Sequence, residues 1–321
     1  MEIDVLEPVQ LGGITQWIRI RGTSTANPVL LLMQQGPGLP IINEARAWEQ
    51  RLGLEKDFTV VYWDQRGTGL SALPLGCEGR FEITPELMVA DTIALLELLR
   101  DRYGRKTFIA GFSFGATYAA RAAVLRPDLI AGIVAAGMDI DVPFAEQHMY
   151  EWALAQARTR GSKRAIGQLE KIGPPPHLDT KKFTTRARWI TNFGGVTAGA
   201  TGNSLARTLV TSLLRSPDYS PAAALRTIRG FTSSQAALLP LLAHTDLVTT
   251  MPTLEVPIIL VQGRLDQVAP GSAAQRFYDT LAAPSKQLVW FEHSAHTPQY
   301  DEPAKFRDVL LALRAGDLAA T

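Results

Sequence analysis

The chain has 321 residues, of which 46% are hydrophobic and 20% are charged, with 32 lysines and arginines against 31 aspartates and glutamates. A net charge of +1 removes the broad electrostatic attraction on which nucleic-acid binding depends, so no nucleic-acid partner is expected. The single cysteine, Cys77, cannot form an intrachain disulfide. The acidic first residues do not resemble a signal peptide, and no apolar run approaches the ~20 residues of a membrane span. We therefore expect a cytoplasmic protein without a membrane partner.

Short apolar runs bounded by turn residues alternate with helical patterns up to about residue 140 and again after residue 250. Several runs are apolar on both faces, as strands buried between two helical layers should be. This alternation predicts an α/β fold with a mostly parallel central sheet flanked by helices. The predicted strands are Gln16–Arg21 as the edge strand of an opening hairpin, Val29–Met33, Phe58–Trp63, Thr107–Phe112, Ile130–Ala136, Pro257–Gln262 and Gln287–Phe291.

Two helices are predicted between these strands. The first spans Thr84–Tyr103, because Thr84 can cap it and Pro85 suits its first position. The second spans Phe114–Arg126 and ends before Pro127, which disfavours a helical conformation in the preceding residue.

Residues 141–250 contain no convincing strand, and their aromatic residues lie within helical patterns. We therefore predict a helical cap at 141–250, inserted between the two core segments 1–140 and 251–321. The cap carries 13 basic and 7 acidic residues, a net charge of +6, which leaves −5 for the rest of the chain.

The sharpest local motif is Gly111-Phe112-Ser113-Phe114-Gly115, which lies between a predicted strand and a predicted helix. A serine on such a sharp turn needs small neighbours, because the backbone leaves no room for side chains at the two glycine positions. The turn lifts the Ser113 hydroxyl to a helix N-terminus, where partial positive charge favours a developing anion. Ser113 is therefore the candidate nucleophile.

A serine is a weak nucleophile unless a base takes its proton and an acid orients that base. His293 and His296 follow the last predicted strand, at the carboxyl edge of the sheet, whereas the other three histidines lie in the cap. Small residues precede His296 at the turn of its loop, so placement favours His296 as the base. Asp266 follows the preceding strand at the same edge.

Asp139 and Asp141, which follow an earlier strand, are alternative acids that spacing does not exclude.

Four motifs carry a family resemblance: Gln34-Gln35-Gly36-Pro37-Gly38, the run Asp64-Gln65-Arg66-Gly67-Thr68-Gly69-Leu70-Ser71, the Gly111–Gly115 turn, and Gly263–Asp266 with His296. The chain resembles the α/β-hydrolases, in which nucleophile, acid and histidine follow in this order. Within them it is similar to the proline iminopeptidase group of S33-type serine peptidases, for which the Asp64–Ser71 run is the more specific marker. This resemblance implies an α/β-hydrolase fold with a cap.

The resemblance also implies roles for single residues. In that group the catalytic histidine is followed by an acid, a proline and a phenylalanine, a continuation that Asp301-Glu302-Pro303 and Phe306 match from His296 only. It likewise favours Asp266 over Asp139. An oxyanion hole is expected from the backbone N–H groups of Gly36 and Phe114.

The chain departs from the group at Gln34-Gln35, where a His-Gly pair is common. An amide can brace the loop in place of the histidine, but Gln35 adds a bulky side chain. We therefore expect an altered substrate preference or reduced activity. The residues considered as pocket lining are Gln34, Gln35, Phe112, Trp152 and Trp189.

The predicted function is that of a serine hydrolase, free of cofactor and metal, which cleaves an ester, lactone or amide bond of a small molecule through an acyl-enzyme. A first alternative is an iminopeptidase-type aminopeptidase acting on short peptides. That reaction requires a cationic N-terminus to be bound, and burying an ammonium without a carboxylate partner is costly in a cap so poor in acids. A second alternative, motivated by Gln34-Gln35, is a non-hydrolytic enzyme or ligand-binding protein of this fold.

Overall fold

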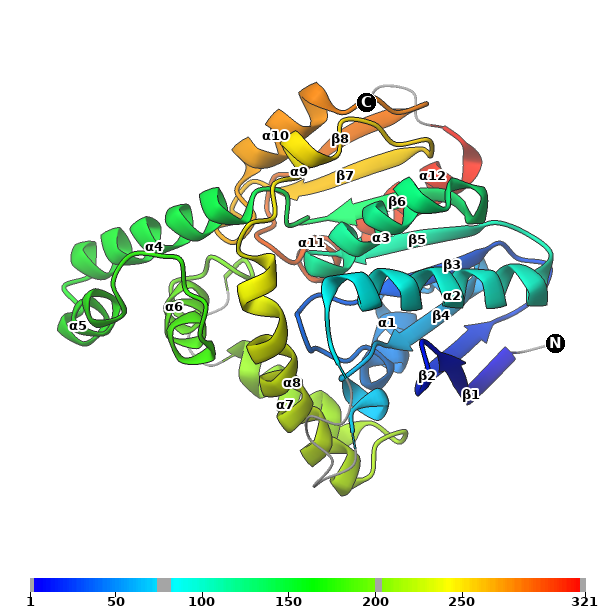
Figure 1. The fold of residues 1–321 in the computed structure, drawn as a ribbon, viewed down its shortest axis with the longest axis horizontal. Helices are drawn as coiled ribbons and strands as arrows, with labels where there is room; N and C mark the ends of the chain where they lie inside the picture. The colour runs from blue at the N-terminus through cyan, green and yellow to red at the C-terminus, as the bar shows by residue number, and fades with distance from the viewer. Residues whose placement is uncertain (1–2, 74–81, 200–203, 318–321) are drawn as a thin grey trace.

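The computed structural model describes residues 3–73, 82–199 and 204–317, and Cys77 lies outside them. Within these residues eight strands form one sheet in the order β1-β2-β4-β3-β5-β6-β7-β8 (Figure 1). β2 is antiparallel to both of its neighbours, β1 and β4. All the remaining neighbouring pairs, from β4 to β8, are parallel. The strands are β1 Ile3–Leu11, β2 Ile14–Gly22, β3 Val29–Met33, β4 Thr59–Asp64, β5 Thr107–Phe112, β6 Ile130–Ala136, β7 Ile258–Gly263 and β8 Lys286–Phe291.

The predicted α/β fold with a mostly parallel sheet is confirmed, with one correction at the edge. The hairpin predicted at the N-terminus is present, but β2 is paired on both sides, so that β1 and not Gln16–Arg21 forms the edge of the sheet. β1 contains Pro8 and charged residues, which interrupt the apolar pattern by which a strand is recognised in a sequence. Both residue types are typical of edge strands, which is where β1 lies.

Two apolar layers enclose the sheet. Along β3, Val29, Leu31 and Met33 face one cluster of buried residues, whereas Leu30 and Leu32 face the other. The first cluster includes residues of α2 Pro85–Tyr103, α3 Phe114–Leu125 and α10 Gly271–Thr280, and the second includes residues of α1 Ala45–Leu52 and α12 Pro303–Ala315. This double burial explains why the parallel strands are apolar at consecutive positions.

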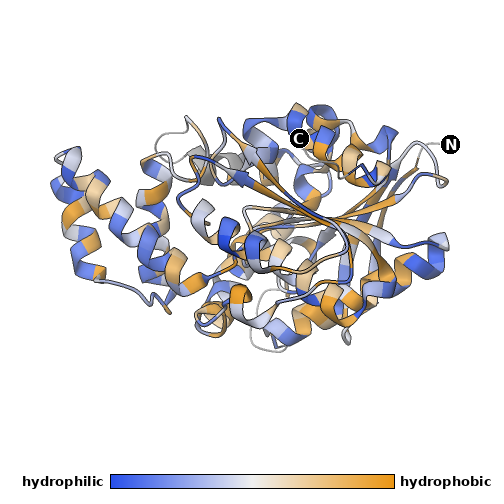
Figure 2. Ribbon diagram, turned by 90° about the horizontal axis from the view of Figure 1, so that it is seen from above, coloured by the Kyte–Doolittle hydropathy of each residue, from blue (hydrophilic) through white to orange (hydrophobic). Residues whose placement is uncertain are grey.

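The segment between β6 and β7 is helical in its described residues. α4 to α6 project from one end of the sheet, and α8 crosses beside them (Figures 1 and 2). A separate apolar cluster joins α4, α5 and α6. The helices are α4 Val142–Thr159, α5 Lys163–Ile172, α6 Thr180–Asn192, α7 Ser204–Arg215, α8 Pro221–Leu242 and α9 Leu247–Thr250. Among the described residues no helix combines the length and apolarity needed to span a membrane.

Asp64, at the end of β4, joins the core to this helical segment. Its buried carboxylate accepts hydrogen bonds from the backbone N–H groups of Ile41, Ile42 and Leu70 at 3.0, 3.1 and 2.8 Å, and from the hydroxyl of Tyr219. Burial raises the pKa of Asp64, and these donors oppose that shift, Tyr219 most strongly. The Asp64–Ser71 run therefore forms a loop that is braced at Asp64.

We expect Tyr219→Phe to lower the free energy of unfolding by about 1–3 kcal/mol, because it leaves a buried carboxylate short of one donor. Urea unfolding followed by circular dichroism measures this loss. Tyr150→Phe is the matched control, since the Tyr150 hydroxyl has no hydrogen-bond partner among the described residues. An equal loss in both variants would contradict the bracing role of Tyr219.

Candidate active site

Ser113 lies on a tight turn between β5 and α3. Its φ of +51° is in the left-handed region, and it is the only described non-glycine residue with a positive φ. A Cβ at Gly111 would lie 2.5 Å from Cα of Ala116, and one at Gly115 would lie 2.2 Å from the carbonyl oxygen of Met33. The two glycines therefore let the turn pack against β3 and α3. This close packing holds Ser113 in a backbone conformation that costs about 1–3 kcal/mol.

The structure brings Asp266 and His296 together. His296 Nδ1 lies 2.9 Å from Asp266 Oδ2, and the other carboxylate oxygen accepts backbone hydrogen bonds from Val268 and Ala269 at 2.7 and 3.0 Å. Both side chains are buried. Because Nδ1 binds the carboxylate, Nε2 is the nitrogen left to accept a proton from a substrate or nucleophile.

The electrostatic surroundings favour the protonated imidazole. Burial by itself lowers the pKa of His296, but the Asp266 carboxylate, helped by Asp139, outweighs it, so the pKa of His296 lies above its usual 6.5. A buried base with a raised pKa beside a carboxylate is typical of a general acid–base group.

The residues after His296 hold its loop in place. Asp301 accepts a hydrogen bond from the backbone N–H of Ala295 at 3.0 Å, and Glu302 accepts one from the hydroxyl of Ser294 at 2.6 Å. These bonds give a physical reason for the acidic pair ahead of Pro303. His293 is exposed.

Asp139, one of the alternative acids considered from the sequence, contacts the candidate nucleophile. The Ser113 hydroxyl donates to Asp139 Oδ1 over 3.3 Å. Burial raises the pKa of Asp139 to about 6, against the opposing effects of His296 and Ser113. Asp139 comes just after β6, the neighbour of β5 in the sheet, which is why it lies near Ser113. Asp141 instead caps α4 and pairs with Arg276 at 2.8 Å.

The loop after β3 forms another wall of the site. The Gln34 side chain donates to the carbonyl of Pro40 and accepts from the N–H of Gln35, both over 2.8 Å, so each end of its amide braces the loop. Gly36 lines the cavity beside Ser113, and Phe114 begins α3, where N–H groups have no intrahelical acceptor. That these two N–H groups form an oxyanion hole stays a prediction.

A cavity of about 230 Å³ lies between the carboxyl ends of the parallel strands and the cap. Ser113 and His296 are in its wall. Most of its other lining residues are apolar; they include Leu39, Val142, Ala145, Met149, Phe183, Ile190, Val196, Phe231, Leu239 and Val268. The cavity therefore suits a small, largely apolar group next to the serine.

Of the five residues considered as pocket lining, only Gln35 lines this cavity. Gln34 is buried in its loop, and Phe112 packs against Trp48 with ring centroids 5.1 Å apart. Trp152 and Trp189 pack against Phe193, within the apolar cluster of the cap. These large aromatic residues pack in the apolar clusters of the sheet and of the cap, and most of the residues that line the cavity are aliphatic.

Three polar residues in the cavity wall bind one another. Arg186, which is 1% exposed, donates to Glu146 at 2.6 Å and to His177 Nδ1 at 2.9 Å. The other oxygen of Glu146 accepts from the backbone N–H of His177 at 3.2 Å. Burial, together with the Arg186 charge, lowers the pKa of His177. Glu146, the one cap acid among the described residues of the cavity wall, is thus already paired with a cation.

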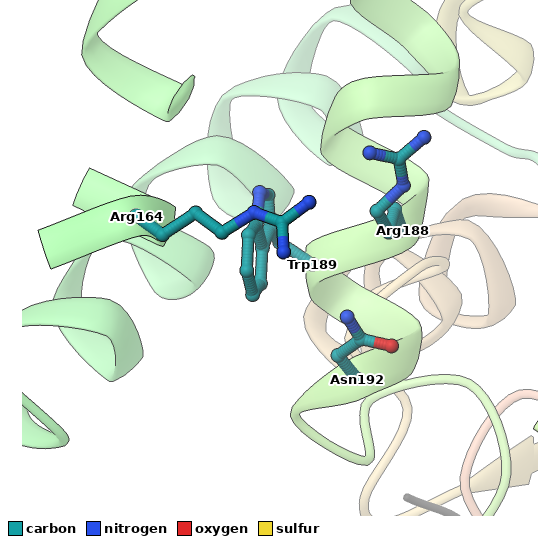
Figure 3. A pocket seen from close by; sticks show the side chains of 4 residues that line it. All are labelled: Arg164, Arg188, Trp189 and Asn192. Carbon is teal, nitrogen blue, oxygen red and sulfur yellow. The ribbon is translucent and has the colours of Figure 1, made fainter. Parts of the chain in front are cut away.

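A second hollow, of about 280 Å³, lies on the cap and is lined by Arg164, Arg188, Trp189 and Asn192. Arg164 extends from α5 toward α6, which carries the other three residues (Figure 3). These lining residues include no nucleophile and no acid, in contrast to those of the cavity at Ser113.

The fold and this site define an α/β-hydrolase. A family model described as serine aminopeptidase, S33, matches residues 54–303, which is more than half of the chain. The chain therefore belongs to the S33 serine aminopeptidase family of hydrolases.

Relatives named as aminopeptidases are among the similar proteins. The chain is 28% identical over 310 residues to the protein named "Probable aminopeptidase YbaC" of Bacillus subtilis (strain 168), covering 96% of this chain and 95% of that one. Its fold matches the proline iminopeptidase-related protein from Thermus thermophilus with a TM-score of 0.66 at 19% identity, covering 99% of both chains. It also matches the proline iminopeptidase of Mycobacterium smegmatis with a TM-score of 0.61 at 18% identity, covering 99% and 100%. The sequence prediction of this family is confirmed.

We expect the rate at which a fluorophosphonate labels Ser113 to rise with pH, with a midpoint above 6.5, because the neutral form of His296 is the base. In Asp266→Asn the midpoint should lie lower than in the wild type, since burial is then opposed only by the Asp139 carboxylate. Asp141→Asn is the control and should keep the wild-type midpoint. A midpoint that does not move in Asp266→Asn would refute the pairing as the cause.

Proposed function

We propose that the protein is a serine hydrolase that cleaves an ester, lactone or amide bond of a small substrate through an acyl-enzyme. The observation that carries this proposal is the position of Ser113 on its strained turn, beside the buried His296–Asp266 pair and facing a mostly apolar cavity. The acyl group of the substrate occupies that cavity.

In this mechanism the Ser113 hydroxyl attacks the carbonyl carbon and His296 Nε2 takes its proton. Asp266 holds the imidazole in the required tautomer and stabilises the imidazolium. The N–H groups of Gly36 and Phe114 bind the oxyanion, and His296 then protonates the leaving group. Water activated by His296 hydrolyses the acyl-enzyme, which restores the free serine.

Attack requires the Ser113 hydroxyl to leave Asp139 and donate to His296. The Ser113–Asp139 hydrogen bond, at 3.3 Å, is longer than the ~2.8 Å typical of hydroxyl donors and is correspondingly weak. A rotation about one side-chain bond, between staggered rotamers, exchanges the two acceptors.

Aminopeptidase action is the second candidate, favoured by the family and by the relative from Bacillus subtilis. The same acyl transfer at Ser113 would release an N-terminal residue. This reaction needs a carboxylate that binds the substrate ammonium, and the cap contains few acidic residues.

We expect a fluorophosphonate probe to label the intact protein and not to label Ser113→Ala. The same variant should lose at least ~10³-fold in the hydrolysis of 4-nitrophenyl butyrate and of prolyl 4-nitroanilide, assayed side by side, because removal of a triad nucleophile leaves only binding and the oxyanion hole. Circular dichroism checks that the variant is folded.

Labelling that survives Ser113→Ala would contradict Ser113 as the nucleophile. An intact protein that is not labelled and hydrolyses neither substrate would favour the non-hydrolytic alternative. The ratio of the two rates distinguishes an esterase from an aminopeptidase.

A further inference from the structure

We propose that Gln235, in the cap helix α8, binds a neutral amide of the substrate and so selects acyl groups that end in a primary carboxamide. This inference rests on the proposed acyl-enzyme function and deepens it by naming the substrate class. The contact joins two uncharged groups, so it needs no acidic residue in the cap.

The side-chain amide of Gln235 is buried without a protein partner. The residue is 1% exposed, and its Oε1 atom has no hydrogen-bond partner among the described residues. No described residue accepts a hydrogen bond from its Nε2 either. Buried polar side chains are nearly always hydrogen-bonded, and leaving one without a partner lowers stability. The partner of this amide therefore comes from the contents of the cavity, which are solvent in the free protein and substrate in the complex.

Gln235 faces the cavity from a side of α8 that is otherwise apolar. Four residues of this helix line the cavity at intervals of three and four positions, which places them on one helix face: Phe231, Gln235, Leu239 and Leu242. Only Gln235 among them forms hydrogen bonds through its side chain. No neighbour on this face can therefore replace the ligand as a partner for its amide.

The packing of α8 against the loop after β3 brings Gln235 near the acyl group. A Cβ at Gly38 would lie 2.9 Å from Cα of Phe231, so this loop lies directly on α8. Gly36, in the same loop, lines the cavity with Ser113. A cavity of about 230 Å³ holds roughly eight non-hydrogen atoms, at the ~30 Å³ that one water molecule occupies in the liquid. An acyl chain attached to Ser113 therefore reaches Gln235 within a few carbon atoms.

Away from the nucleophile, the other polar side chains of the described cavity wall have partners or reach solvent. Glu146 and Arg186 form an ion pair, and the Thr191 hydroxyl donates to the carbonyl of Ala187 at 2.8 Å. Gln35 is only half-buried, so solvent can satisfy its amide. The amide on α8 is therefore the group that gains most from a hydrogen bond to the substrate.

A primary carboxamide is a neutral group that satisfies both ends of the Gln235 side chain. Its carbonyl oxygen accepts from Nε2, and its N–H donates to Oε1. Rotation about the last side-chain bond of Gln235, which has broad energy minima, turns the amide toward the ligand. A hydrocarbon branch of the same size satisfies neither end and displaces solvent from the amide. Such a site rejects the hydrocarbon more strongly than its shape alone would.

The experiment compares methyl succinamate with methyl 4-methylpentanoate, and methyl glutaramate with methyl 5-methylhexanoate. Within each pair a terminal carboxamide replaces an isopropyl group that has the same number of non-hydrogen atoms. The ratio of the two kcat/KM values is measured in a pH-stat for wild type, Gln235→Met and the matched control Gln299→Met. Gln299 is 2% exposed and its Oε1 also lacks a partner among the described residues, but it is not in the described cavity wall.

We expect the ratio of carboxamide ester to hydrocarbon ester to fall about 10- to 100-fold in Gln235→Met for at least one pair. The ratio should stay at the wild-type value in Gln299→Met. The urea midpoint of Gln235→Met should not fall, because Met fills a similar volume without a buried unpaired amide.

Hydrolysis of the esters with unchanged ratios in Gln235→Met, whatever its urea midpoint, would overturn the role of Gln235 and leave the hydrolase assignment intact. Hydrolysis of none of the four esters, without fluorophosphonate labelling, would overturn the proposed function itself.

A measurement on the wild-type protein covers the case in which Gln235→Met does not fold. Each kcat/KM is divided by the rate constant for hydroxide-catalysed hydrolysis of the same ester. An apolar cavity without a hydrogen-bond partner disfavours a carboxamide, which loses its hydration there. We therefore expect a corrected ratio above one in at least one pair, and a ratio below one in both pairs would contradict the proposal.

Discussion

The left-handed backbone at Ser113 is the constraint on which the rest of the site depends. It exists because Gly111 and Gly115 let the turn press against Ala116 and the carbonyl of Met33, closer than any side chain would allow. β5 is central, paired with β3 on one side and β6 on the other. The strained residue is therefore held by the most buried part of the sheet, and the loops after those two neighbouring strands supply the groups around its hydroxyl.

Parallel strands explain why residues so far apart in the chain converge. The loops after β3, β5, β6, β7 and β8 all leave from one edge of the sheet, which brings Gln35, Ser113, Asp139, Asp266 and His296 to the same place. Each loop is fixed by its own hydrogen bonds: Gln34 braces the first, and Asp301 braces the last. The cap completes the enclosure, since the carbonyl of Val196 accepts the N–H of His296 at 2.9 Å.

The fold was predictable from sequence, because it depends on local patterns: apolar runs and a glycine-flanked serine between a strand and a helix. Spacing alone left Asp139 and Asp141 open beside Asp266, and the family resemblance favoured the pairing of Asp266 with His296 that the structure shows. The residues that line the cavity could not be predicted from the sequence. Trp152 and Trp189 attract attention as large aromatic residues, yet only tertiary packing decides that they join Phe193 inside the cap. Likewise Asp139 and Asp141 are equivalent by spacing, but in the structure one faces the nucleophile and the other faces Arg276.

The net charge of the cap likewise does not show which charges face the cavity. The excess of basic residues over 141–250 argued against a cationic substrate, but composition averages over positions that differ in their access to the cavity. Arg164 and Arg188 are exposed around a separate hollow on the cap, and Arg186, which does reach the cavity wall, is neutralised by Glu146. The charged group next to Ser113 in the cavity wall is the carboxylate of Asp139, from the core segment with the net negative charge. At short range in a poorly screened cavity, the nearest charge outweighs the distant and solvated ones.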